Sequence, residues 1–106
     1  MVAINEITEF AQRIGEEFKA HKVILFGSHA EDRAGRDSDV DLFIVMPFEG
    51  RRAEQAVEIY MKLRPRFPVD LIVRTPEEVH HRLEIGDSFV QDVLANGKTL
   101  YESKSG

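Results

Sequence analysis

The stretch VILFGSHAEDRAGRDSDVDLFIV, residues 23–45, places two apolar runs on either side of a polar segment rich in aspartate. The first run, residues 23–26, ends at Gly27-Ser28, and the second, residues 40–46, ends at Pro47. Short apolar runs bounded by Gly, Ser and Pro are typical of buried strands. We therefore expect two strands joined by a turn or short helix, with carboxylates where the second strand begins.

Outside this stretch, apolar residues recur at helical spacing in residues 4–20, which predicts an amphipathic helix. A second helix is expected over residues 51–64, with its apolar side formed by Ala53, Ala56, Val57, Tyr60 and Met61. Two more are expected, one from an N-cap at Thr75 to Gly86 and one from Asp87 to about Gly97.

Two further extended pieces are expected, at residues 69–73 and 99–101. The resulting order is helix, strand, strand, helix, strand, helix, helix and a last extended piece. This order predicts a small α/β or α+β domain in which helices cover a mixed sheet.

Size and composition limit the classes of function. A chain of 106 residues with 42% hydrophobic residues fits one domain, residues 1–106, with no second domain to hold a substrate. Its net charge of −5, with Lys and Arg scattered along the chain, disfavours stand-alone binding of nucleic acid. Cysteine is absent, which excludes disulfides and thiolate zinc sites. With no signal peptide and no membrane-spanning run, we expect a cytoplasmic protein without a membrane partner.

Three aspartates are candidate metal ligands. Asp39 and Asp41 are two residues apart at the start of a predicted strand, so they point to the same face of the sheet. Asp70 interrupts the apolar run of residues 69–73, where a buried carboxylate needs a positive partner. If the two strands are neighbours, the three carboxylates can converge on an all-oxygen site suited to Mg²⁺. Two ions there could activate an attacking oxygen and neutralise a leaving pyrophosphate.

Gly27 and Ser28 are candidate phosphate ligands. A glycine at the end of a buried strand lets the backbone approach a ligand closely, and the following N–H groups and the Ser28 hydroxyl can hold phosphate oxygens. Each feature alone has an ordinary structural explanation, because aspartate-rich turns and Gly-Ser sequences are common at strand ends. Their combination with Asp70 favours a site for metal and phosphate. In contrast, His80 and His81 are adjacent on a predicted helix and point in different directions, which disfavours zinc.

The pattern of Gly27-Ser28 followed by Ser38-Asp39-Val40-Asp41-Leu42, with Asp70 on a later strand, resembles the DNA polymerase β-type nucleotidyltransferase superfamily. The small size and the C-terminal segment are similar to its minimal nucleotidyltransferase (MNT) branch. The resemblance covers about residues 22–102. It implies a mixed sheet flanked by helices, and transfer of a nucleotidyl group from ATP, with Mg²⁺, to an acceptor hydroxyl.

The resemblance also implies roles for individual residues. Asp39 and Asp41 would hold the metal ions, and Asp70 would hold one ion and help deprotonate the acceptor. Gly27, Ser28 and Ser38 would bind the phosphates of ATP. Many members of the branch carry Arg-Gly shortly after the Gly-Ser, where this sequence has Glu31-Asp32. Arg36 or Arg33 could supply the missing positive charge.

The resemblance implies a partner as well. Small proteins of the MNT branch are often antitoxins that add AMP to a tyrosine of a HEPN-domain toxin, and an acidic surface suits a basic partner. One alternative is a non-catalytic, nucleotide-binding module that neutralises its partner by direct binding, which the Glu31-Asp32 departure favours. Another is nucleotidyl transfer to a small molecule or to RNA. A homodimer could form through an exposed sheet edge or the apolar face of the helix at residues 51–64.

Overall fold

A computed structural model describes residues 2–30 and 39–104 of the chain. The elements follow the order α1 (Ile4–Phe18), β1 (Lys22–Phe26), a short 3-10 turn (Gly27–His29), β2 (Val40–Val45), α2 (Arg52–Leu63), β3 (Val69–Arg74), α3 (Pro76–Glu84), α4 (Ser88–Asn96) and β4 (Lys98–Glu102). These bounds confirm the helices and strands predicted from the sequence. No helix in the described ranges is long and apolar enough to cross a membrane.

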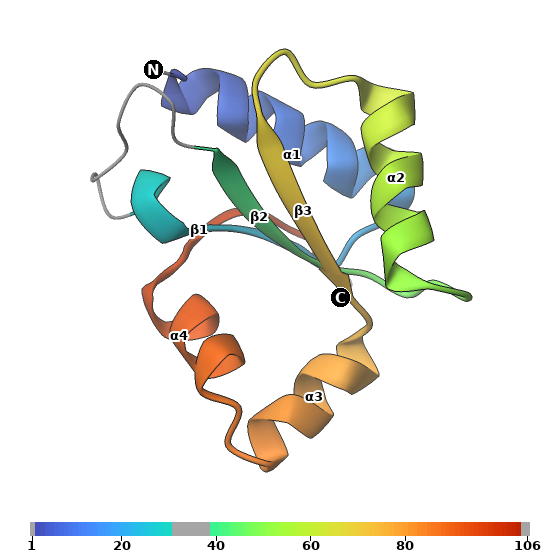
Figure 1. The fold of residues 1–106 in the computed structure, drawn as a ribbon, viewed down its shortest axis with the longest axis vertical. Coiled ribbons are helices and arrows are strands. Elements are labelled where there is room, and N and C mark those ends of the chain that lie inside the picture. Colours follow the sequence, from blue (N-terminus) through green and yellow to red (C-terminus); the bar gives the residue numbers. More distant parts are fainter. Residues whose placement is uncertain (1, 31–38, 105–106) are drawn as a thin grey trace.

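The four strands form one mixed sheet in the order β3-β2-β1-β4 (Figure 1). β1 pairs antiparallel with both β2 and β4, whereas β2 pairs parallel with β3. A parallel pair requires a crossover connection, and α2 supplies it between β2 and β3. The expectation of a mixed sheet with helices on its faces is therefore confirmed.

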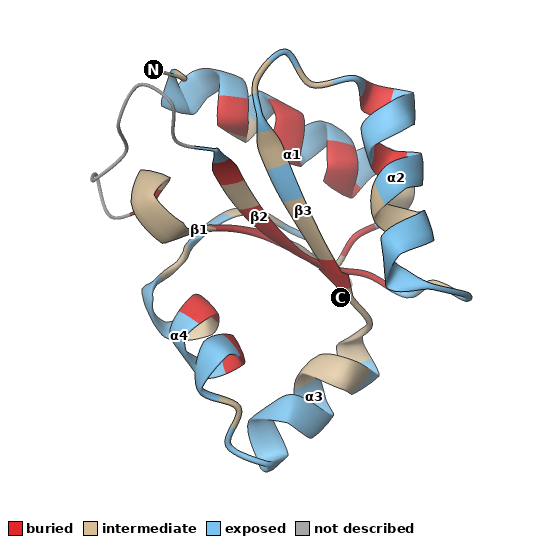
Figure 2. Cartoon of the chain, viewed as in Figure 1, coloured by how far each residue is buried: buried red, intermediate tan, exposed pale blue. Residues whose placement is uncertain are grey.

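Helices cover both faces of the sheet, with α1 and α2 on one face and α3 and α4 on the other (Figure 1). On β2, Leu42 and Ile44 pack in the larger core against α1 and α2. Phe43 and Val45 point to the opposite face, where they pack with Val90 of α4. The most buried residues lie on the central strands and on the inner sides of the helices (Figure 2). Because side chains alternate along β2, Asp41 belongs to the same face as Phe43.

The orientation of α2 decides which of its apolar side chains are buried. Ile59 and Leu63 are the buried residues of this helix, and both belong to the core formed with α1. Val57 and Met61, which lie on the apolar side expected from the sequence, are 60% and 58% exposed, so this side faces away from the core. The helix carries two apolar stripes, and the one with Ile59 and Leu63 faces the sheet.

Candidate functional site

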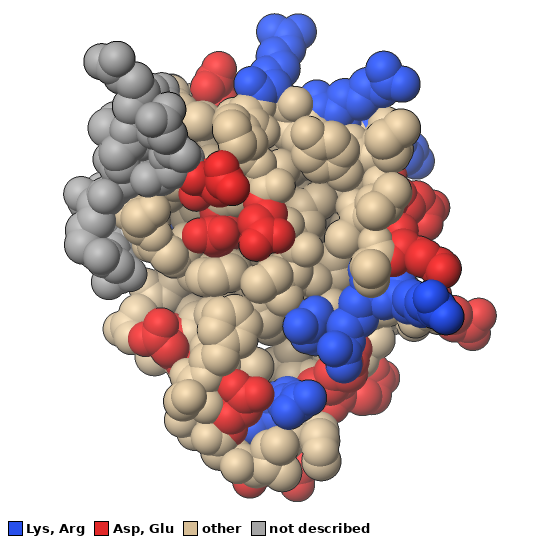
Figure 3. All heavy atoms as spheres, in the orientation of Figure 1, with Lys and Arg blue, Asp and Glu red and all other residues tan. Residues whose placement is uncertain are grey.

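Asp41 and Asp70 lie side by side on neighbouring strands. The parallel register of β2 and β3 pairs Asp41 directly with Asp70. Asp39 immediately precedes β2 and is exposed, two residues from Asp41. The backbone therefore brings all three sequence-predicted carboxylates to one end of these strands, and Figure 3 shows acidic side chains gathered on this face of the molecule.

The Gly-Ser turn lies directly against Asp41. Gly27 has a φ of 76°, in the left-handed region that favours glycine. A Cβ atom on Gly27 would lie 2.5 Å from Oδ2 of Asp41. Gly27 and Ser28 form a short 3-10 turn in which the N–H of Ala30 donates to the carbonyl of Gly27 at 3.1 Å. Glycine is thus required at position 27 both by the left-handed backbone conformation and by the close approach of the Asp41 carboxylate.

The electrostatics of the site centre on Asp41. Burial raises the pKa of the Asp41 carboxyl above its ordinary value of 3.8, and the neighbouring Asp70 and Asp39 raise it further. His29 acts in the opposite direction and favours the charged form. Asp70 is exposed because β3 is an edge strand, so its carboxylate needs no buried positive partner, in contrast to the sequence argument. The site therefore concentrates negative charge around a partly buried Asp41.

The described residues give only part of the predicted ligand set. Ser38, Arg36 and Arg33 lie outside the described residues, as do Glu31 and Asp32. Within residues 2–30 and 39–104, no group of three or more His, Cys, Asp or Glu side chains is arranged to hold a metal ion. What the structure brings together is a carboxylate pair on adjacent strands, a third carboxylate one step before β2, and the Gly-Ser turn.

Residues 7–97 match the model of one protein family, the nucleotidyltransferase domain. The chain belongs to this nucleotidyltransferase family. The match includes the Gly-Ser turn, the Asp39 and Asp41 motif and Asp70. The chain is also 28% identical over 97 residues to a protein of Methanocaldococcus jannaschii that carries the provisional name protein adenylyltransferase, covering 90% of this chain and 94% of that protein.

Solved structures share the fold of this nucleotidyltransferase. A provisionally assigned nucleotidyltransferase from Sulfolobus solfataricus superposes with a TM-score of 0.65 at 18% identity, covering 97% of this chain and 83% of that chain. A toxin-antitoxin crystallised with AMP-PNP superposes with a TM-score of 0.57 at 23% identity, covering 98% of this chain and 77% of that chain. At these identities the likeness concerns the fold.

A basic group that the sequence prediction missed lies at the other end of β3. Arg74 shares the face of Asp70, since the two are four residues apart on one strand. Burial lowers the pKa of Arg74, and the nearby Arg52 lowers it further, while Glu78 raises it. Arg52 forms an ion pair with Glu78 at 2.5 Å. The alternation of side chains along residues 69–74 is the signal that could have placed Arg74 on this face of the nucleotidyltransferase.

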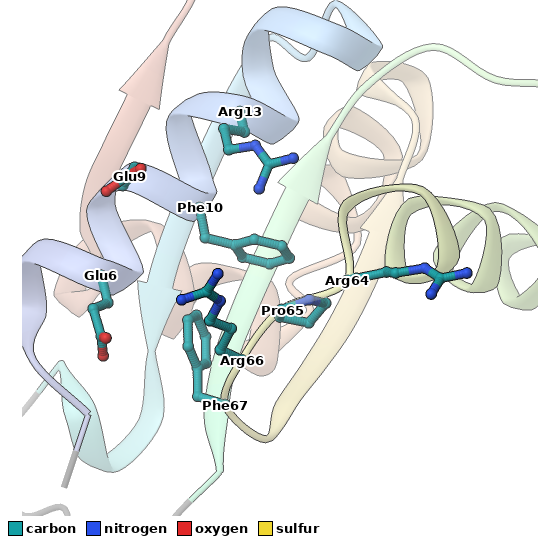
Figure 4. A pocket seen from close by; sticks show the side chains of 8 residues that line it. All are labelled: Glu6, Glu9, Phe10, Arg13, Arg64, Pro65, Arg66 and Phe67. Carbon is teal, nitrogen blue, oxygen red and sulfur yellow. The ribbon is translucent and has the colours of Figure 1, made fainter.

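A separate hollow of about 300 Å³ lies between α1 and the segment that precedes β3 (Figure 4). Its wall includes Phe10 and Phe67, whose rings meet edge to face with centroids 5.6 Å apart. Both phenylalanines pack with the core on the α1 and α2 side of the sheet. This hollow therefore belongs to the face opposite Asp41, and it is distinct from the carboxylate site of the nucleotidyltransferase.

Proposed function

We propose that this nucleotidyltransferase uses Mg²⁺ and ATP to transfer AMP to a tyrosine hydroxyl of a partner protein, as the antitoxin of a HEPN toxin. The observation that carries the proposal is the pairing of Asp41 with Asp70 in the parallel register, directly against the Gly27 turn. This arrangement supports a site where metal-bound carboxylates and a phosphate-binding turn meet. The name of the Methanocaldococcus jannaschii relative supports the choice of a protein as acceptor.

The donor set fits Mg²⁺. Carboxylate oxygens are the ligands that this ion prefers, and it is usually held by one or two carboxylates together with substrate phosphates and water. A complete cage of protein ligands is therefore not needed before the nucleotide binds. The raised pKa of Asp41 supports the same assignment, because crowded carboxylates gain most from a nearby cation. Asp39, Asp41 and Asp70 would hold the metal, which would neutralise the triphosphate and the pyrophosphate leaving group.

The proposed reaction is a displacement at the α-phosphorus of ATP. The acceptor oxygen forms a bond to this phosphorus, the bond to the bridging oxygen of the β-phosphate breaks, and pyrophosphate leaves. The acceptor proton passes to the Asp70 carboxylate, which is exposed on the edge strand and open to an incoming partner. Gly27 and Ser28, together with Ser38 and Arg36, would hold the triphosphate.

The choice of a partner protein as the acceptor rests on charge and on the comparisons. The net charge of −5 suits a basic partner. A structure of the same fold is a toxin-antitoxin crystallised with AMP-PNP, which supports both the nucleotide and the type of partner.

Incubation of the purified chain with Mg²⁺, α-labelled ATP and the HEPN-domain protein of its source genome tests the proposal. We expect label on a partner tyrosine, dependence on Mg²⁺, and loss of label with the Asp39→Asn, Asp41→Asn double variant. Glu16→Gln, an exposed substitution on α1, is the matched control and should leave the label unchanged.

The second candidate function is neutralisation by binding alone. The Glu31-Asp32 sequence in place of the usual Arg-Gly of the branch favours it, because a basic residue beside the triphosphate is replaced by acids. If the Asp39→Asn, Asp41→Asn variant still neutralises the partner and the wild-type chain leaves no label on it, the transferase proposal is wrong. Label on a small molecule or RNA in place of the partner would also contradict it.

A further inference from the structure

The outward face of α2 exposes a stripe of apolar side chains. Val57, Tyr60 and Met61 are 60%, 44% and 58% exposed, while Ile59 and Leu63 on the opposite side are buried in the core. In the described part of the chain, no other helix or strand exposes as many large apolar side chains. Exposed apolar side chains that gather on one helix face are typical of an association surface.

Opposite charges flank this stripe. Glu54 precedes Val57 by three residues on α2, and Arg64, the residue that caps the C-terminal end of α2, follows Met61 by three residues. Glu54 forms no ion pair within the described residues. The one bond described for the Arg64 side chain runs from its Nε to the carbonyl of Met61 at 3.4 Å. The stripe therefore has an acidic end and a basic end.

We propose that the outward face of α2 is a self-association surface that pairs antiparallel with α2 of a second copy of this chain. In a two-fold symmetric pair, each copy presents the same patch to the other. With antiparallel helices, Val57 lies opposite Met61 of the second copy, and Glu54 lies opposite Arg64 of the second copy. A parallel pair would place like charges together. The charges of Glu54, near the start of α2, and Arg64, at its C-cap, are thus complementary to each other in the antiparallel orientation.

This pairing leaves the carboxylate site open. The buried side of α2 packs on the sheet face that carries Leu42, whereas Asp41 points to the other face. The exposed stripe of α2 points away from the sheet and from Asp41. A dimer formed through α2 would therefore carry two carboxylate sites that remain accessible to partners.

Sedimentation velocity of the wild-type chain, at concentrations from about 1 to about 200 μM, tests the proposal. A single helix pair buries less area than the roughly 1,600 Å² of a standard interface, so a reversible, concentration-dependent dimer is expected. The average mass should rise with concentration towards twice the 12.1 kDa of the chain. Val57→Asp should hold the mass at that of the monomer over the whole range.

Charge exchange tests the antiparallel orientation. Glu54→Arg and Arg64→Glu should each weaken the dimer at least tenfold, and the double variant should restore it, because both ion pairs are rebuilt with reversed sign. Ile85→Asp, which removes an equally exposed apolar side chain outside α2, is the control and should dimerise like the wild type. Thermal unfolding confirms that each variant folds.

Three results would overturn the proposal. The wild-type chain could stay monomeric over the whole range. The Ile85→Asp control could lose the dimer as fully as Val57→Asp, which would mean that the contact lies elsewhere. The double charge variant could fail to recover, which would exclude the antiparallel pair. A monomer whose Val57→Asp variant binds the HEPN protein less tightly would assign this face to that protein.

Discussion

Gly27 and Asp41 are in such close contact that a single added methyl group at Gly27 would overlap the Asp41 carboxylate, with its carbon 2.5 Å from Oδ2. The turn that follows β1 and the carboxylate on β2 are therefore fixed relative to each other. Because β1 and β2 pair antiparallel with Phe26 opposite Asp41, the contact is built into the register of the sheet. This relationship gives a direct test of the site.

Gly27→Ala should destabilise the chain and weaken ATP binding. The left-handed φ of 76° costs an alanine about 1–2 kcal/mol, and the overlap with Asp41 adds to this cost. Gly86→Ala is the matched control, because Gly86 has a similar φ of 77° with nothing within 4 Å of its added Cβ. Urea unfolding and ATP titration should show a smaller loss of stability in Gly86→Ala and unchanged ATP affinity. Equal effects of the two substitutions would contradict the role of the Asp41 contact.

Asp41→Asn should stabilise the metal-free chain at neutral pH. Burial, Asp70 and Asp39 raise the pKa of Asp41 in the folded state, so the wild type loses stability as pH rises through that folded pKa. The variant avoids this loss, and the gain should be below about 1 kcal/mol because the carboxylate is partly solvated. The two unfolding curves should converge as pH falls below the ordinary value of 3.8.

Addition of Mg²⁺ should reverse this order of stability. Ion binding to the folded state stabilises the wild type by mass action, and Asp41→Asn removes one ligand of the proposed site. Thermal unfolding with and without Mg²⁺ measures the shift. A wild-type melting temperature that does not respond to millimolar Mg²⁺, alone or with ATP, would count against the proposed metal ligands.

Glu78→Gln should lower stability at neutral pH and have no effect in acid. Burial acts to raise the pKa of Glu78, but the Thr75 N–H and the Arg52 guanidinium outweigh it and hold the pKa below its ordinary value of 4.5. The charged form therefore stabilises the fold at neutral pH, and this contribution disappears as pH falls through the folded pKa. Glutamine keeps the capping position, so the loss should be about 0.5–1 kcal/mol. Glu77→Gln, an exposed neighbour, should change little.

Ile59→Ala should cost about 2–4 kcal/mol, whereas Val57→Ala should leave stability unchanged within about 0.5 kcal/mol. Ile59 is fully buried and Val57 is 60% exposed, although the two are only two residues apart on α2. Urea unfolding at low protein concentration, where any dimer has dissociated, measures the difference. A large loss in Val57→Ala would mean that the outward stripe packs within the folded chain.

The positions of the helices and strands could be predicted because each has a clear pattern and a clear end. Residues 23–26 and 42–45 are continuous apolar runs, and the helix after Thr75 begins with the predicted N-cap, which the structure confirms. The buried side of α2 could not be predicted, because this helix has two apolar stripes. Which one is buried depends on the sheet that it meets, and hydrophobic periodicity carries no information on that choice.

The candidate site was partly predictable for a similar reason. Alternation along a strand places Asp39 beside Asp41, and the sheet order then decides whether Asp70 joins them. The exposure of Asp70 on an edge strand, and the contact of Gly27 with Asp41, depend on tertiary packing and leave no local signal. The predicted phosphate ligands Ser38 and Arg36 lie outside the described residues and stay predictions.

The parallel pairing of β2 with β3 has a consequence for folding. The β1 and β2 hairpin involves nearby segments and closes a short loop, but Asp70 reaches Asp41 only after the chain has crossed the sheet through α2. Contacts that close longer loops form more slowly, so the carboxylate pair should assemble late. A partly folded chain would then hold the glycine turn without the full set of acids. Metal affinity, followed during refolding, would thus report the step at which β3 joins β2.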